Sequence, residues 1–138
     1  MKSTTSTTTV RNLGYWTSTS LVSFVLLSGG VASLLRRPDN VQGMAELGYP
    51  AYMLTILGFW KVLGAVALLS PRLPRLKEWA YAGTLFDLTG AAFSHAVIGP
   101  DPSHAVWPAL FAVLALVSWS LRPADRVLGS LRPAAVAA

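Results

Sequence analysis

Residues 13–35 read LGYWTSTSLVSFVLLSGGVASLL and contain no charged side chain. A helix of this length, rising about 1.5 Å per residue, is long enough to cross a hydrocarbon core of ~30 Å. Three further windows share this character: residues 51–70, 79–98 and 104–121. All four windows together hold only two charged residues, Lys61 and Asp87. This segregation is typical of membrane helices, because a central Asp, Lys or Arg costs roughly 2.5–3.5 kcal/mol on insertion scales.

The composition of the whole chain supports the same interpretation. Of the 138 residues, 53% are hydrophobic and 12% are charged, whereas a soluble domain carries about 25% charged residues. The absence of cysteine excludes a thiol nucleophile, a disulfide scaffold and a Cys-linked haem. We therefore expect no covalently bound cofactor. The net charge of +5 is divided among the loops without a basic helix or an aromatic RNA motif, so we expect no nucleic-acid partner.

These features predict an all-α fold, an integral membrane four-helix bundle over residues 13–121. We expect a mobile N-terminal tail over residues 1–12 and a C-terminal tail over residues 122–138, in which the Ala-rich end from Pro133 to Ala138 is mobile. Prolines in the connections support the limits of the spans, since a proline breaks or starts a helix. They are Pro50, Pro71, Pro74, Pro100 and Pro102.

The distribution of Lys and Arg predicts the orientation. One side of the bundle carries eight of them: Lys2, Arg11, Arg72, Arg75, Lys77, Arg122, Arg126 and Arg132. The other side carries only Arg36 and Arg37. Loops rich in Lys and Arg stay in the cytoplasm. We therefore expect a multi-pass protein of the cell membrane, which is the inner membrane in a bacterium, with both termini in the cytoplasm (N-in, C-in).

Lys61 and Asp87 form the strongest candidate site. Each lies eight residues from the inner end of its span, so both should lie about 12 Å above the inner boundary. Consecutive spans with a short connection are neighbours, and the opposite charges can therefore meet within the membrane. Intramembrane ionisable residues commonly mark ligand or proton pathways. The alternative is a structural ion pair that joins two helices.

Residues around this pair extend the site. Gly58 and Gly64 share a helix face with Lys61, while Gly83, Gly90 and Ser94 share one with Asp87. Small residues allow close helix packing, and beside a charge they also leave room for a ligand. Trp60 either covers this pocket from the side or meets lipid. In the first span, Ser20, Ser23, Leu27 and Gly30 form a stripe whose hydroxyls could reach the pair.

Two histidines form a second polar group nearer the outer face. His95 lies about 12 Å beyond Asp87 along the helix, and His104 follows in the next window. Asp87, His95 and His104 could form a proton relay; alternatively, His95, Asp101 and His104 could bind a metal. Neither spacing is a recognised ligand motif, so no metal is expected. Glu78 and Trp79 are interpreted as structural residues at the membrane interface.

The sequence contains no recognised catalytic motif. No Gly-rich nucleotide loop, HExxH helix or GxSxG elbow is present. Whether the protein is an enzyme therefore stays open.

The stretch from Leu47 to Gly99 resembles the DoxX-like family of small four-helix membrane proteins. The resemblance rests on LGYP, GFWKVLGA, LLSP, KEWAYAG, FDLTGA and SH, in that order. It implies a membrane location and a four-helix bundle. The family takes its name from proteins linked to a terminal quinol oxidase and to thiosulfate:quinone oxidoreductase, while a related animal protein is a receptor assembly chaperone.

We consider three functions. In the leading hypothesis, a small membrane subunit handles a quinone-like redox partner in a polar notch lined by Lys61, Asp87 and His95. The second is a non-enzymatic ligand-binding or membrane-protein assembly factor, and the third is a proton-coupled carrier. The expected partners are the lipid bilayer, and a second copy of the chain or another membrane protein.

Overall fold

The computed structural model describes residues 3–129, which form helices joined by turns and contain no strand. The elements are α1 (Ser3–Leu34), α2 (Pro38–Glu46), α3 (Tyr52–Leu69), α4 (Pro74–Val97), the 3₁₀ turn η1 (Pro102–Ala105), α5 (Val106–Ser120) and the 3₁₀ turn η2 (Ala124–Arg126). The expected mobile segment Pro133–Ala138 lies outside the described residues.

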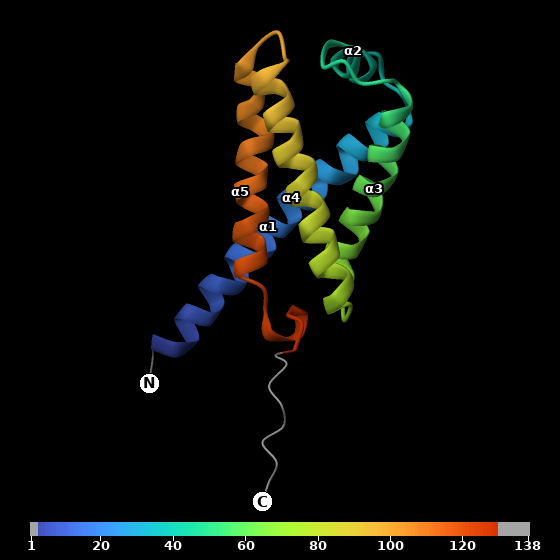
Figure 1. Cartoon of the computed structure of the whole chain (residues 1–138). Helices are drawn as coiled ribbons and strands as arrows, with labels where there is room; N and C mark the ends of the chain where they lie inside the picture. Colours follow the sequence, from blue (N-terminus) through green and yellow to red (C-terminus); the bar gives the residue numbers. More distant parts are fainter. Residues whose placement is uncertain (1–2, 130–138) are drawn as a thin grey trace, which may run out of the picture.

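The four longest helices contact one another in a ring. Helix α1 packs against α3 and α5, and α4 packs against α3 and α5 (Figure 1). Figure 1 shows α4 and α5 side by side, with α1 crossing behind them to reach α3. The start of α1, the turn between α3 and α4, and η2 lie at one end, which we call the terminal end. Helix α2 and η1 lie at the opposite, distal end.

Three helical segments are long and apolar enough to cross a membrane: Thr7–Leu34, Tyr52–Leu69 and Pro102–Ser120. They correspond to the first, second and fourth expected windows. Helix α4 is absent from this group of described helices, although its 24 residues exceed the expected third window. Its sequence is less apolar, because Asp87 and His95 interrupt it together with two glycines and several hydroxyl residues.

The structure also adds regular elements that the sequence analysis did not anticipate. Helix α1 begins at Ser3, so most of the expected N-terminal tail is helical. Helix α2 begins with Pro38 at its first turn and occupies the loop between the first two windows. Arg36 and Arg72 adopt the left-handed conformation, with φ of 49° and 56°, and turn the chain after α1 and α3.

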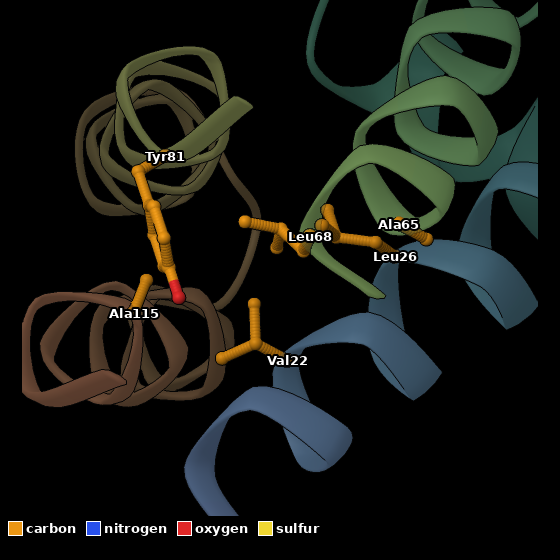
Figure 2. Close-up of a cluster of buried hydrophobic side chains, with 6 residues drawn as sticks. All are labelled: Val22, Leu26, Ala65, Leu68, Tyr81 and Ala115. Atoms are coloured by element: carbon orange, nitrogen blue, oxygen red, sulfur yellow. The ribbon is translucent and has the colours of Figure 1, made fainter. Parts of the chain in front are cut away.

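The core lies where the four long helices meet. It consists of Val22, Leu26, Ala65, Leu68, Tyr81 and Ala115. Figure 2 shows that Tyr81 extends from α4 toward α1 and α5, while Leu68 reaches in from α3. The core is thin, and many large apolar side chains on all four helices are exposed. Such outward-facing apolar surface suits a lipid environment.

The crossing of α1 and α3 depends on two glycines. A methyl group at Gly58 would lie 2.8 Å from the carbonyl oxygen of Gly30 and 3.0 Å from Leu34 Cγ. A methyl group at Gly30 would lie 3.0 Å from the Gly58 oxygen and from Lys61 Cβ. Small residues allow this backbone contact, which is the usual basis of close helix packing in lipid. The contact also fixes Lys61 at the crossing.

We expect Gly58→Ala to lower the free energy of unfolding by about 1–3 kcal/mol, because the methyl group would push α3 away from α1. Gly29→Ala is the matched control, since a methyl group there would meet no atom within 4 Å beyond its own helical turn. The free energy of unfolding of that variant should be unchanged or raised by up to ~1 kcal/mol, because alanine has a higher helix propensity than glycine. Unfolding in detergent measures both changes, and equal stability of the two variants would contradict the tight crossing.

Candidate functional site

Lys61 and Asp87 form an ion pair between α3 and α4. The distance from Lys61 Nζ to Asp87 Oδ2 is 3.4 Å, and the two side chains are 25% and 17% exposed. The predicted contact is therefore confirmed. The carboxylate oxygen is buried but makes no hydrogen bond within the described residues. Its hydrogen-bonding capacity is therefore unused, apart from the electrostatic contact with the Lys61 ammonium.

The pair lies at the wall of a cavity of about 680 Å³ between α3 and α4. The wall includes Trp60, Lys61, Gly64, Gly83 and Asp87, and Leu26 contributes from α1. It continues toward the terminal end through Ser70, Leu73, Leu76 and Trp79. Apart from Lys61, Asp87 and a few hydroxyl groups, the lining is apolar. Its volume falls in the range of about 300–1,000 Å³ that is typical of small-molecule sites.

The glycines near the pair have different surroundings. Gly58 is packed tightly against α1, whereas methyl groups at Gly83 and Gly90 would meet no neighbouring atom within 4 Å. Gly83 lines the cavity and Gly90 does not. Trp60 both lines the cavity and is exposed, so the two interpretations of this residue hold together.

The expected polar stripe on α1 is only partly correct. Ser23 and Gly30 are buried, but Ser20 and Leu27 are exposed. The buried face of α1 instead follows Tyr15, Thr19, Val22 and Leu26. The cause is the diagonal course of α1, which changes its neighbour from α5 to α3 along its length (Figure 1).

Ser94, His95 and His104 form a separate group at the distal end. The two imidazole rings are in edge contact with centroids 5.9 Å apart, and His95 Nδ1 is buried without a hydrogen-bond partner in the described chain. The Ser94 hydroxyl bonds the Tyr49 hydroxyl at 2.9 Å. None of these residues lines the cavity. The structure therefore brings together His95 and His104, but it shows no contact that joins either to Asp87.

Asp101 makes a local turn in the same region. Its carboxylate accepts a hydrogen bond from the Ser103 amide at 2.9 Å, and this bond lowers the pKa of Asp101 below its usual value. Within the described residues, no cluster of three or more His, Cys, Asp or Glu side chains is placed to hold a metal ion. The alternative of a metal site at the two histidines gains no support from this geometry.

At the terminal end, Glu78 joins α4 to the end of α5. Its carboxylate accepts hydrogen bonds from Arg122 Nη1 at 2.7 Å and from Trp119 Nε1 at 3.0 Å. Burial favours the protonated acid, but these two hydrogen bonds and the Arg122 charge outweigh it and lower the pKa of Glu78. Trp79, the neighbouring interfacial residue, is 81% exposed and lines the cavity.

Lys77 lies in the first turn of α4, before the expected third window, and is fully buried. Its ammonium donates to the carbonyl oxygens of Ala67 and Leu68 at 2.9 and 2.5 Å, and so satisfies carbonyls in the last turn of α3. Burial, together with the charges of Arg126 and Arg122, lowers the pKa of Lys77 from 10.5 to about 8. Lys77 thus joins the ends of α3 and α4.

A buried hydroxyl cluster connects α1, α4 and α5. The Ser118 hydroxyl lies 2.6 Å from Thr19 Oγ1 and 2.7 Å from the Tyr81 hydroxyl. Nearby, Arg126 of η2 donates to the Tyr15 hydroxyl at 3.3 Å and lies over the Trp16 ring. The sequence analysis missed these residues, because a hydroxyl in an apolar window shows no sign of which distant helix it will meet.

The fold and the site define a class: a helical membrane protein with an ion pair at the wall of an apolar cavity. The model of the DoxX-like family matches residues 17–118, and the chain belongs to that family. This finding confirms the resemblance inferred from the sequence. Neither the curated proteins nor the solved structures include a significant match to the chain.

We expect Lys61→Met and Asp87→Asn each to destabilise the protein by on the order of 1–3 kcal/mol, because either change leaves one polar group without its partner. The double variant should lose less than the sum of the two single losses. Unfolding in detergent measures the stability of the wild type, the two single variants and the double variant. Additive losses would show that the two side chains do not interact.

Proposed function

We propose that α4 is a fourth membrane span and that the protein is a four-helix bundle with both chain ends in the cytoplasm. Two neighbours of α4, α3 and α5, overlap candidate spans, and 24 helical residues extend ~36 Å. The ion pair with Lys61 offsets the cost of Asp87 within lipid. The terminal end carries Arg72, Arg75, Lys77, Arg122 and Arg126, which supports the cytoplasmic side for that end.

The absence of cysteine makes this topology directly testable. Ala124→Cys places one exposed thiol at the terminal end, and Ala45→Cys places one in α2 at the distal end. In intact cells, a membrane-impermeant maleimide should label Ala45→Cys and spare Ala124→Cys until the membrane is opened. Labelling of both positions, or the reverse pattern, would contradict the proposed orientation.

We further propose that the cavity binds a quinone-like lipophilic molecule. The single observation that carries this proposal is the Lys61–Asp87 pair at the wall of an otherwise apolar cavity of about 680 Å³. Apolar pockets with a few polar groups are typical of small-molecule sites, in which the polar groups fix the orientation. Membership of the DoxX-like family is compatible with this proposal but does not identify the ligand.

The residues of the cavity have complementary roles in this proposal. The Lys61 ammonium donates a hydrogen bond to a carbonyl oxygen of the ligand, and the partly exposed Asp87 carboxylate accepts one from a hydroxyl group. Trp60 and Trp79 supply aromatic surface toward opposite ends of the cavity. His95 and His104 stand apart and take no part in holding the ligand.

The proposal predicts that a benzoquinone with a ten-carbon chain quenches tryptophan fluorescence in lipid nanodiscs, because two of the five tryptophans line the cavity. Lys61→Met should weaken binding by about tenfold or more, the usual value of a hydrogen bond from a charged donor. Arg75→Met removes an exposed positive charge outside the cavity and should leave binding unchanged. Equal affinity of wild type and Lys61→Met would refute the proposed site.

A further inference from the structure

The cavity is elongated and has its charged groups toward one end. Its wall follows α3 from Leu57 to the end of the helix before Ser70, a distance of ~18 Å along the helix. On α4 it follows the chain from Asp87 back to Leu76, a similar distance. Lys61 and Asp87 mark the distal part of this space, and apolar side chains line most of the remainder. The space therefore suits a molecule with one polar end and an apolar chain.

The cavity is also open to its surroundings along its length. Several of the side chains that line it are exposed: Trp60, Leu63, Val66, Leu73, Leu76 and Trp79. Since a side chain that both lines the cavity and is exposed must lie at its margin, the opening runs between α3 and α4. In the proposed orientation, this margin faces the cytoplasmic leaflet of the bilayer.

Gly83 lies between the charged end and the opening. It is four residues before Asp87 on α4, lines the cavity, and has no neighbouring atom within 4 Å of the position that a methyl group would take. A glycine inside a helix lowers stability by about 1 kcal/mol relative to alanine. At Gly83 no close contact with another helix requires a glycine. Its effect is to leave the middle of the cavity open.

We propose that an amphiphile with one chain and an uncharged head enters the cavity from the cytoplasmic leaflet. This inference rests on the proposed function. The head lies against the Lys61–Asp87 ion pair at the wall of the cavity, and the chain passes Gly83 toward Trp79. An uncharged head fits because the two side chains already balance each other, and both are partly exposed, so that the ammonium can donate a hydrogen bond and the carboxylate can accept one. A charged head would lose its hydration in the apolar cavity and would gain little net attraction from the balanced pair.

Substitution of Gly83 tests this placement. In nanodiscs, Gly83→Phe should weaken quenching by the ten-carbon benzoquinone at least tenfold, because the ring would fill the path of the chain. Gly90→Phe is the matched control, since Gly90 is also on α4 with free space around it but lies outside the cavity. It should bind within twofold of wild type. Gly83→Ala and Gly83→Leu introduce smaller side chains at the same position. They should weaken binding less than phenylalanine and in order of size, so the placement can still be tested if the phenylalanine variant does not fold.

Three further comparisons separate this proposal from the quinone proposal. If Gly83→Leu and Gly83→Phe bind the quinone as wild type does while Lys61→Met does not, the path of the chain is overturned and the quinone site stands. A different result is that the wild-type protein does not bind the quinone, but decanol reduces the quenching of Trp79 by a brominated lipid, and Gly83→Phe abolishes this effect of decanol. The quinone proposal would then be wrong, while the path of the chain past Gly83 would be supported. Decanoate ion should bind at least tenfold more weakly than decanol, and equal binding would overturn the uncharged head.

Discussion

The close approach of Gly30 and Gly58 is the constraint on which the rest of the structure depends. It brings the backbones of α1 and α3 into contact and places Lys61 at the crossing. Because α1 occupies one side of Lys61, the ammonium reaches Asp87 on α4, the neighbouring helix. The ion pair is thus a consequence of small-residue packing elsewhere, and any change in the angle between α1 and α3 would move one partner away from the other.

The polar contacts at the terminal end complement this crossing. The Ser118 hydroxyl holds α1 and α4 beside α5, and Glu78 holds α4 to Arg122. Lys77 closes the end of α3 against the start of α4. Since the helices are held together by these contacts and by the crossing of α1 and α3, the segments of α3 and α4 between the ion pair and Lys77 do not need to pack tightly against each other. An apolar cavity can persist there, and its lining remains available to a lipophilic molecule.

Much of this arrangement could be predicted from residue order alone. Charge is so costly in lipid that Lys61 and Asp87 stand out in any uncharged window, and equal spacing from a short connection places them at one depth. The contacts of Thr19 with Ser118 and of Glu78 with Arg122 could not be predicted in this way. They depend on the tilt of α1 and on the path of the chain after α5, which hydrophobic periodicity does not encode. Helix α2 was missed for a similar reason, because a short polar helix resembles a loop in composition.

In the proposed four-span topology, Lys61 and Asp87 lie at equal depth, and this arrangement determines how the site responds to the membrane potential. In a bilayer, an isolated charge at this depth would feel part of the transmembrane voltage, about 2.3 kcal/mol per charge for a full crossing at 100 mV. Two opposite charges at one depth cancel this work, and an uncharged molecule adds none. Occupancy of the cavity should then follow the amount of ligand dissolved in the leaflet and be independent of whether the cell is energised.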